Sequence, residues 1–526
     1  MSCAGLPERF NAATMFVDVH RGAGRAGKTA ILCGDEAITY GQLQDGVNQF
    51  GNALLGLDVR IEERIAFLLP DSPQWAYVFF GAIKIGAVAV PLNTLLAPRD
   101  YEYLLNDSRA RVLVVHESLL GQISPIRKSL RYLVHLVTTG AAGPDQLSLG
   151  TLMEGASSAL TPADTSRDDA AFWLYSSGTT GSPKGAIHLH HDMVVESDQY
   201  ARTTIGLDES DVSFSVAKLF FAYGLGNGLY FPLATGGTTV LLPDRPLPER
   251  VFEVIDDYQP TVFYGVPTSY AAMLHYAEKT GRTSLGRVRM CIAAGETLPR
   301  QIFLRWRERF RVEILDGIGS TEILHIFISN RPGRAKAGST GQIVPGYEAR
   351  IVDDDGRDLP PGQVGTLLIR GESIAAGYWN KHAATKQTFC GEWINTHDKF
   401  MVDPDGYFWY AGRADDMMKV SGQAVWPAEV EGVLQGHPAV LESGVTGAED
   451  NEGLLKPVAY VVLKDGYSPS PELARELQDF VKQNAAPHKY PRAVVFLEAL
   501  PKTATGKIKR FELRERAAVD GLLRAH

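Results

Sequence analysis

The stretch Tyr175-Ser-Ser-Gly-Thr-Thr-Gly-Ser-Pro-Lys-Gly185 places five Ser or Thr hydroxyls, three glycines and one lysine within eleven positions. It follows the apolar run Ala171–Leu174, whose length and composition are typical of a short strand. Glycines let backbone N–H groups approach phosphate oxygens, hydroxyls donate further hydrogen bonds, and Lys184 adds positive charge. The stretch therefore predicts a phosphate-binding loop after a strand, although its composition is equally typical of a Ser/Gly-rich surface turn.

The spacing of this loop differs from that of the common phosphate-loop ATPases. Their pattern, GxxxxGK[ST], puts a lysine directly after the second glycine, whereas Lys184 follows Pro183. An ordinary P-loop NTPase is therefore disfavoured. The glycines of Gly224-Leu-Gly-Asn-Gly228 do not form GxGxxG either, so a dinucleotide site is not indicated.

Short β-rich runs alternate with helical patterns over the first two thirds of the chain. Arg111–Val115 and Thr261–Tyr264 are predicted strands, and Met290–Ala294 runs through Gly295 into a helical stretch near Pro299. This alternation predicts an α/β fold of mainly parallel sheets flanked by helices, with ligands at the carboxyl ends of the strands.

The pattern changes from about Ala337 onward. Gly341–Val352 and Gly365–Arg370 predict a β-rich subdomain of short strands. Beyond Asp415 the pattern predicts a small α+β unit, with strands at Ala459–Leu463 and Ala493–Leu497 and a helix at Pro471–Gln483. We therefore expect two domains, a large one over residues 1–414 and a small one over residues 415–526.

The composition bounds the class of protein. A chain of 526 residues exceeds one hydrophobic core, and 45% hydrophobic with 21% charged residues is ordinary for a soluble protein. The net charge of −9 argues against a nucleic-acid partner. The four cysteines form no CxxC pair, and no signal peptide or membrane-length apolar run is present, since Trp75–Ile83 is too short. We expect a cytoplasmic protein that does not bind membranes.

The eleven residues of the loop resemble the phosphate loop of the adenylate-forming superfamily, which contains acyl-CoA synthetases, luciferases and peptide-synthetase adenylation domains. The large domain would then be the adenylation domain, which holds ATP and the acid. By this resemblance, the residues that contact the ATP phosphates are Ser176, Ser177, Gly178, Thr179, Thr180, Gly181 and Lys184.

Asp316-Gly-Ile-Gly-Ser-Thr-Glu322 resembles the YGxTE motif of the same superfamily. The resemblance implies that Thr321 contacts the AMP phosphate and that Glu322 helps to hold Mg²⁺, with Thr180 as a further metal contact. Ile318 replaces the usual tyrosine, so any adenine contact there is aliphatic packing. The segment is also compatible with an ordinary helix N-cap followed by an acid.

Two further segments resemble nucleotide contacts of the superfamily. Ala294-Gly-Glu296 resembles the segment that touches adenine, although a strand-to-helix turn has the same pattern. Asn395-Thr-His-Asp398 stands where the family has TGD, whose carboxylate suits two ribose hydroxyl donors. The implied nucleotide-binding residues are Ala294, Gly295, Glu296, Asp316, Gly317, Ile318, Asp398 and Arg413.

The C-terminal part carries two more resembling motifs. Gly412–Gly422 resembles the family's hinge, which implies that Arg413 meets the ribose, Asp415 is the pivot, and Lys419 and Gly422 line the tunnel for coenzyme A. A charged, solvated linker is the alternative. Pro501-Lys-Thr-Ala-Thr-Gly-Lys507 resembles PxTxxGK, which implies that Lys507 is the catalytic lysine between the acid's carboxylate and the α-phosphate. Without that motif it would be read as a surface lysine.

The candidate acid pocket is aromatic and contains no carboxylate. Peptide-synthetase adenylation domains carry an aspartate that grips an α-ammonium group, and Lys218–Gly228 has none, which disfavours an amino acid substrate. This segment, Phe263–Thr268 and Asp316–Asn330 closely resemble aryl-CoA ligases of the benzoate and hydroxybenzoate type. The resemblance implies a slot for a flat ring. Its lining residues are Ala222, Tyr223, Gly224, Tyr264, Gly317, Gly319, His325 and Ile326.

Histidines leave two alternatives open. His325 is either a pocket residue or a helix residue buried in the core. The cluster His188, His190 and His191 suggests a metal site, but a packing corner between a strand and a helix is favoured.

We therefore predict an ATP-, Mg²⁺- and CoA-dependent aryl-CoA ligase, a monomer or homodimer whose partners are small molecules. A standalone enzyme that loads an aryl group onto a carrier protein is the second hypothesis. A binding protein without catalysis is the third, and the retained polar residues Lys184, Glu322, Asp398, Arg413 and Lys507 argue against it. The preferred ring substituents are not predicted.

Overall fold

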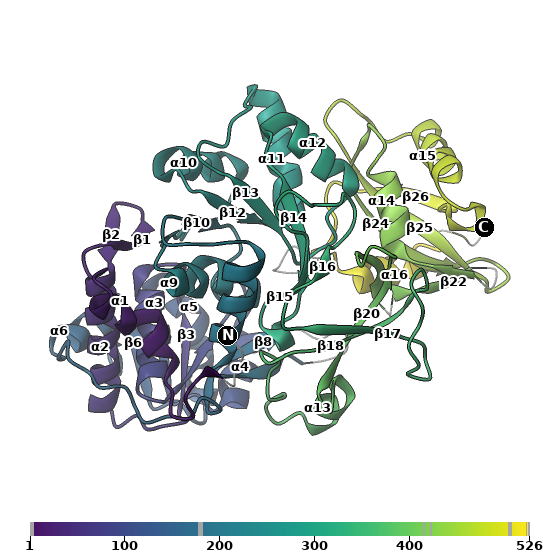
Figure 1. Ribbon diagram of the computed structural model, residues 1–526. Helices are drawn as coiled ribbons and strands as arrows, with labels where there is room; N and C mark the ends of the chain where they lie inside the picture. Colours follow the sequence, from purple (N-terminus) through teal and green to yellow (C-terminus); the bar gives the residue numbers. More distant parts are fainter. Residues whose placement is uncertain are drawn as a thin grey trace.

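A computed structural model describes residues 5–176, 182–413, 416–420, 423–502, 508–521 and 523. Two large sheets, a smaller antiparallel sheet and a C-terminal unit make up the chain, and Figure 1 shows the C-terminal unit at the end of the molecule opposite the first helices. Among the described residues, no helix combines the length and the apolar composition that crossing a membrane requires.

The first large sheet has seven strands in the order β7-β6-β5-β3-β4-β8-β9, all parallel except the last pair. Its central strands are uniformly apolar because helices such as α2 (Tyr40–Gly56) and α3 (Pro73–Lys84) cover them. The strands are β3 (Arg64–Leu68), β4 (Val88–Pro91), β5 (Val112–Val115), β6 (His135–Thr138), β7 (Leu147–Ser148), β8 (Ala170–Ser176) and β9 (Lys184–Leu189).

The second large sheet has nine strands in the order β16-β15-β14-β13-β12-β10-β11-β1-β2, parallel from β14 through β1. Helices α10 (Pro248–Tyr258), α11 (Pro267–Thr280) and α12 (Arg300–Phe310) lie together along one side of it (Figure 1). The strands are β1 (Thr29–Cys33), β2 (Glu36–Thr39), β10 (Val212–Ser215), β11 (Thr238–Val240), β12 (Val262–Gly265), β13 (Met290–Ala293), β14 (Ile314–Gly319), β15 (Ile326–Ser329) and β16 (Gln342–Ile343).

The third sheet is the predicted β-rich subdomain. Its strand pairs are all antiparallel, and β20 lies beside both β18 and β21. The strands are β17 (Glu348–Val352), β18 (Gly365–Arg370), β19 (Phe389–Cys390), β20 (Trp393–Val402) and β21 (Phe408–Arg413). The α/β fold with a β-rich subdomain is thus confirmed.

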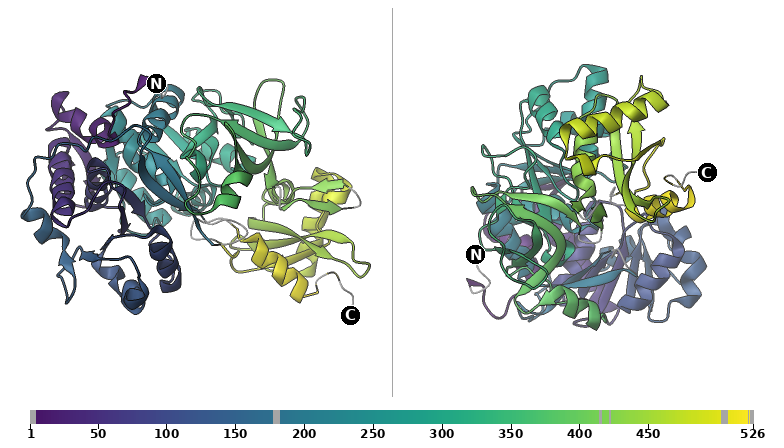
Figure 2. Two further views of the ribbon diagram at one scale, coloured as in Figure 1. Left: turned by 90° about the horizontal axis from the view of Figure 1, so that it is seen from below. Right: turned by 90° about the vertical axis from the view of Figure 1, so that its right-hand side faces the viewer.

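The C-terminal unit has its own core and stands apart from the rest of the chain in the left view of Figure 2. A hairpin of β22 (Met418–Val420) and β23 (Gln423–Val425) leads into a sheet in which β24 pairs antiparallel and β26 parallel with β25. The remaining elements are α14 (Pro427–Leu434), β24 (Val440–Glu449), β25 (Leu455–Leu463), α15 (Pro471–Asn484), β26 (Ala493–Phe496) and α16 (Arg510–Val519). Strand β25 is four residues longer at its start than the pattern predicted, and the proposed boundary at Asp415 lies outside the described residues.

Truncation of the core of the C-terminal unit should destabilise that unit. Leu477 is fully buried on α15, so Leu477→Ala is expected to cost about 2–5 kcal/mol in its unfolding. Scanning calorimetry measures this as a lowered transition temperature. Arg475→Ala, on the same helix with a side chain 70% exposed, is the matched control and should change stability by less than about 0.5 kcal/mol. An unchanged calorimetric profile for Leu477→Ala would contradict a separate core.

Candidate active site

Glu322 lies where the turn between β14 and β15 contacts the strands on either side of the phosphate loop and the segment that bridges to β9. It belongs to the segment that joins β14 to β15 in the second sheet. Ser176, at the end of β8 in the first sheet, donates a hydrogen bond to Glu322 Oε1 over 3.2 Å. Tyr378, in the loop that follows β18 of the third sheet, donates to the same oxygen over 2.8 Å. The predicted phosphate loop and the predicted YGxTE-like motif are therefore in direct contact.

The motif ends in a tight turn. Thr321–Ile323 forms one turn of 3₁₀ helix, and Ser320 Oγ accepts from the Ile323 amide over 3.3 Å. Ser320 is therefore an N-cap, as the structural alternative predicted, and the same segment also lies beside the phosphate loop. Leu324 follows with φ +78° and ψ −48°, a conformation that is rare for a branched side chain.

The phosphate loop connects two paired strands. Ser176 on β8 pairs antiparallel with Lys184 on β9, so the two ends of the loop lie opposite each other in the first sheet. Lys184 Nζ lies 5.2 Å from the centre of the Tyr378 ring. The other predicted loop residues, Ser177, Gly178, Thr179, Thr180 and Gly181, lie outside the described residues.

The two residues predicted to meet the ribose lie side by side. Asp398 on β20 and Arg413 on β21 are directly opposite each other, and Arg413 Nη1 lies 3.3 Å from Asp398 Oδ1. His397 has φ +59°, in the left-handed region that glycine enters freely. This backbone conformation accounts for the glycine that the related TGD motif has at the same position.

The residues predicted near adenine follow β13 and lie on β14. Ala294 is buried, and Gly295 has φ +90° in the connection from β13 towards α12. Asp316 and Gly317 are on β14, and burial raises the pKa of the Asp316 carboxyl well above its usual range. Asp316 is 5% exposed, so its side chain belongs to the protein interior and offers little surface to a bound nucleotide.

The predicted acid pocket places Tyr223 against His325. Tyr223 lies on α8 (Ala222–Leu225), and its ring centre is 5.5 Å from that of His325. His325 Nε2 donates to the Tyr223 carbonyl over 3.2 Å. The Tyr223 hydroxyl lies 3.1 Å from the carbonyls of Gly265, the last residue of β12, and Ile292 on β13. Burial lowers the pKa of His325 to about 3, so the imidazole is neutral at physiological pH.

The helical alternative for His325 is wrong. His325 lies between the 3₁₀ turn and β15, and it is buried at 2% exposure among the rings of Tyr200, Tyr223 and Phe231. His325 is thus not itself a helix residue, and its burial comes from packing against aromatic rings of neighbouring helices.

The predicted pocket glycines permit close packing of the chain. A Cβ on Gly224 would lie 2.1 Å from the Lys218 carbonyl oxygen, and one on Gly319 would lie 2.3 Å from that of His325. A Cβ on Gly317 would lie 3.0 Å from Ile326 Cγ2. Gly224 therefore permits close approach of α8 to the preceding Ala217–Lys218 segment, and Gly317 and Gly319 permit close approach of β14 to β15. Tyr264 on β12 is fully buried.

The three neighbouring histidines lie at the predicted strand-to-helix corner between β9 and α7 (Asp192–Glu196). His190 Nδ1 accepts from the Ala12 amide over 3.0 Å, and His191 lies 3.0 Å from the carbonyls of Arg167 and Glu372. His188 lies 2.8 Å from Asp192 Oδ2. His191 Nε2 also lies 3.1 Å from Asp192 Oδ1, so His188 and His191 share this carboxylate, whereas His190 bonds to Ala12. No group of three His, Cys, Asp or Glu suited to a metal occurs within the described part of the chain.

Four predicted residues belong to the C-terminal part. Lys419 is exposed on β22. Lys507 belongs to residues 503–507, outside the described residues, between Lys502 and Ile508, which form an antiparallel bridge. Asp415 and Gly422 are also outside the described residues.

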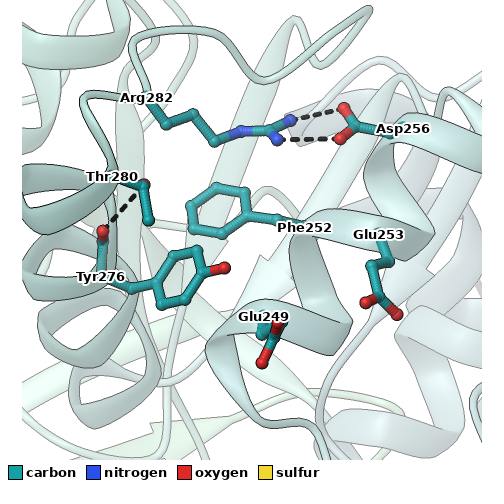
Figure 3. A pocket seen from close by; sticks show the side chains of 7 residues that line it. All are labelled: Glu249, Phe252, Glu253, Asp256, Tyr276, Thr280 and Arg282. Atoms are coloured by element: carbon teal, nitrogen blue, oxygen red, sulfur yellow. Dashed lines mark hydrogen bonds and ion pairs between the residues drawn. The ribbon is translucent and has the colours of Figure 1, made fainter.

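A surface hollow of about 300 Å³ between α10 and α11 is separate from these residues (Figure 3). Glu249, Glu253 and Asp256 line it, and Arg282 forms a two-pronged ion pair with Asp256 across its rim. None of its lining residues belongs to the predicted site.

The sequence interpretation missed the residues that hold the turn from behind. Tyr378, Ser373, His188 and Asp192 carry no motif of their own. The only available indications were the aromatic pair Tyr378-Trp379 after Gly377 and the proximity of the histidines to the phosphate loop. Tyr378, Ser373 and His188 each reach a turn 50 or more residues away in the sequence, and Asp192 acts through His188.

A nucleotide-binding α/β enzyme is the class that this fold and site define, and comparison with known proteins identifies the family. The model of the AMP-binding enzyme family matches residues 19–379, and that of the AMP-binding enzyme C-terminal domain matches residues 429–507. The chain belongs to the AMP-binding enzyme family.

Named relatives match over nearly the whole chain. A benzoate–CoA ligase of Thauera aromatica is 49% identical, over 97% of this chain and 96% of its own length. A 4-hydroxybenzoate–CoA/benzoate–CoA ligase of Rhodopseudomonas palustris is 44% identical, over 96% and 94%. The crystal structure of an anthranilate CoA ligase in complex with anthranoyl-AMP is 43% identical, with a TM-score of 0.95 and 99% of each chain covered.

A buried carboxyl lies beneath the active-site turn. Glu196 on α7 accepts from Tyr347 Oη over 2.6 Å and from Ser373 Oγ over 3.3 Å, and Ser373 also donates to the Ile323 carbonyl over 2.8 Å. Burial raises the pKa of Glu196 to about 8, so the folded protein keeps it protonated at neutral pH.

Glu196 should therefore make stability depend on pH. Its ordinary pKa is 4.5, and between that value and about 8 the unfolded chain ionises this carboxyl while the folded chain keeps the proton. Because the folded state binds more protons, stability falls as pH rises through this window, by up to about 1.4 kcal/mol per pH unit. Glu196→Gln removes this dependence, so its stability relative to wild type should increase from pH 5 to pH 8 and level off above.

Denaturant unfolding at several pH values measures the difference. Glu308→Gln, at an exposed position on α12, is the control and should track wild type at every pH. A constant difference between Glu196→Gln and wild type over pH 5–8 would show that Glu196 is already ionised in the folded protein.

Proposed function

We propose that the protein is an aryl-CoA ligase, which converts an aromatic carboxylic acid of the benzoate or hydroxybenzoate type, ATP and CoA to aryl-CoA, AMP and pyrophosphate. The observation that carries this proposal is the 49% identity to a benzoate–CoA ligase over nearly the whole chain. The buried contact between Tyr223 and His325 supports an aromatic acid, because flat rings pack favourably against such a wall.

The chemistry requires activation of the acid. A carboxylate is a poor electrophile, so its oxygen attacks the α-phosphorus of ATP, the bond to the β-phosphate oxygen breaks, and aryl-adenylate and pyrophosphate form. The CoA thiolate then attacks the acyl carbon and AMP leaves. Since the first step brings two anions together, the protein must mainly position them and neutralise charge.

We assign the phosphate side of the site to the junction around Glu322. Ser176 and Lys184 flank the phosphate loop, and Thr321 meets the α-phosphate. Lys507 then supplies a cation between the carboxylate and the phosphate. Asp398 accepts hydrogen bonds from the ribose hydroxyls, with Arg413 beside it. The 3.3 Å contact between Asp398 and Arg413 supports this arrangement.

The residues present suit Mg²⁺. Both hydrogen bonds to the Glu322 carboxylate fall on Oε1, and no described residue donates to Oε2. One carboxylate oxygen together with ATP phosphates and waters is the typical magnesium environment in such sites. Glu322 would hold the ion, with Thr180 as a second contact, and the ion would neutralise charge on the phosphates when bound.

The second step uses the C-terminal unit. We propose that residues 415–526 move as a domain about Asp415 relative to residues 1–414, which withdraws Lys507 and brings Lys419 and Gly422 to the CoA tunnel. The separate core of this unit supports such motion, since few buried contacts would have to break. The buried free thiols Cys33 and Cys291 suit a reducing compartment, so we place the protein in the cytoplasm. We propose that it acts there as a monomer or homodimer.

A standalone enzyme that loads an aryl group onto a carrier protein is the alternative. It would share the first step and differ only in the thiol acceptor. Incubation with benzoate, ATP, Mg²⁺ and CoA distinguishes the two, since aryl-CoA and AMP accumulate only if free CoA is the acceptor.

Lys507→Ala should separate the two steps. Loss of one preorganised cation is expected to slow pyrophosphate release from benzoate and ATP by about 100-fold or more. Thioester formation from supplied benzoyl-adenylate should be largely retained. Asp415→Pro should do the reverse, because it impairs the proposed hinge.

Lys509→Ala is the matched control for Lys507. Lys509 is a nearby lysine that pairs with Glu512 over 2.7 Å, and its loss should leave both half-reactions near wild type. Wild-type rates of pyrophosphate release in Lys507→Ala would refute the role of Lys507.

Ala222→Leu should narrow the acid pocket at the start of α8. Extra side-chain volume in a packed site costs roughly 1–3 kcal/mol, which corresponds to a loss of about 5–150-fold in kcat/KM for benzoate. The KM for ATP should be unchanged and serves as the internal control. A series of benzoate, hydroxybenzoates, aminobenzoates and cyclohexanecarboxylate measures which acids are affected, and an equal kcat/KM for benzoate in both proteins would exclude Ala222 from the pocket.

A further inference from the structure

A buried imidazole holds the backbone of the active-site turn. His188 on β9 is fully buried, and its Nε2 lies 2.7 Å from the carbonyl oxygen of Thr321, 133 residues further along the chain. Its Nδ1 lies 2.8 Å from Oδ2 of Asp192, the first residue of α7. The ring thus bridges a carboxylate and the residue that precedes Glu322.

The orientation of this ring is determined on both sides. A carbonyl oxygen only accepts, so Nε2 carries a proton and donates to Thr321. The Leu189 amide donates to Asp192 Oδ2 over 3.1 Å, which holds the carboxylate in place. The imidazole also stacks on Phe172, with ring centres 5.1 Å apart and planes inclined by 18°. If the imidazole turned Nε2 away from Thr321, it would lose its contacts with the Thr321 carbonyl, with Asp192 and with the Phe172 ring.

The turn itself needs such support. Leu324 has φ +78°, which costs free energy for a branched residue, and such backbone persists only where neighbours hold it. Three successive carbonyls of the turn are each bound from outside. Thr321 is bound by His188, Glu322 by the Ala375 amide over 2.8 Å, and Ile323 by Ser373 over 2.8 Å.

His188 is distinct among these three supports. Ala375 and Ser373 belong to the chain that follows β18, whereas His188 belongs to the strand that begins at Lys184. His188 is four positions after Lys184 on an extended strand, so the two lie roughly 13 Å apart along one rigid element. His188 therefore ties the strand of the phosphate loop directly to the turn that carries Thr321 and Glu322.

We propose that the pair His188–Asp192 is a positioning device that fixes Thr321 and Glu322 relative to the phosphate loop for binding of magnesium-ATP. The proposal rests on the adenylation function proposed above. His188 and Asp192 touch no substrate in this scheme; they act through the Thr321 carbonyl. Thr321 would meet the α-phosphate in both steps through its side chain, whereas Glu322 would act on the ATP phosphates only until pyrophosphate leaves. Loss of the pair should therefore affect adenylation more than thioester formation, through the displaced Glu322.

The test compares half-reactions and magnesium dependence in variants of the full chain. His188→Ala should raise the Mg²⁺ concentration for half-maximal pyrophosphate release and lower its maximal rate, about 10–100-fold in combination. Formation of benzoyl-CoA from supplied benzoyl-adenylate should change less than about threefold. Thermal stabilisation by ATP with Mg²⁺, relative to ATP with EDTA, should be lost in parallel, and this readout requires no turnover.

Three variants separate positioning from folding. His188→Gln keeps an N–H donor for the Thr321 carbonyl and should recover most of the magnesium dependence. Asp192→Ala frees the imidazole and should reproduce the shift of His188→Ala even if the latter folds poorly. His190→Ala is the matched control, since His190 is equally buried but bonds to Ala12; it should lower the melting temperature and leave the magnesium dependence unchanged.

The outcomes are distinct. Equal losses in both half-reactions for His188→Ala, or the same pattern in His190→Ala, would overturn the proposal and leave His188 a folding residue. If wild type releases no pyrophosphate with any aromatic acid, the proposed function fails, and the stabilisation by magnesium-ATP still decides the role of His188. Absence of that stabilisation in wild type would overturn both.

Discussion

The double hydrogen bond to Glu322 Oε1 is the interaction on which the rest of the site depends. Ser176, at the end of β8, and Tyr378, in a segment that bridges to Ala186 on β9, both donate to one carboxylate oxygen of Glu322, which lies in the turn between β14 and β15. A carboxylate that receives two donors at one oxygen is oriented, because turning it would break both bonds. The other oxygen is thereby directed away from these donors, where a cation and phosphates can be met.

The polar residues around this junction are buried, and each is adapted to burial in its own way. Glu196 accepts from two hydroxyls and keeps its proton at neutral pH, and His325 remains a neutral donor to a carbonyl. Burying a charge without a partner is expensive, so neutral forms are favoured behind the site. Lys184 and Arg413, which carry positive charge, are only partly buried. In the proposed mechanism the interior supplies rigidity and Lys184 contributes positive charge at the phosphates.

Sequence patterns predicted the elements with strong local character and failed where distant parts decide. The strands at Val112–Val115 and Val262–Gly265 were found because buried parallel strands are short and continuously apolar. Asp398 and Arg413 were identified by resemblance, and their pairing across β20 and β21 accords with it. His325 was given a helical alternative because spacing alone does not distinguish a 3₁₀ turn from a longer helix. Gly224 and Gly319 were assigned to the pocket lining, whereas their first requirement is close approach of backbone, which sequence does not display.

The sequence by itself determined the class of chemistry, because residues that meet phosphate, ribose and carboxylate must be of particular types and recur in a particular order. It therefore indicated the phosphate loop, Thr321, Glu322 and Asp398 without any coordinates. Only the tertiary structure decided what holds those residues in place. His188 reaches Thr321 across 133 residues, and Tyr378 reaches Glu322 across 56, because sheet order brings their strands and loops together. Such contacts are properties of packing between elements, and neither residue type nor local spacing encodes which carbonyl a buried side chain will meet.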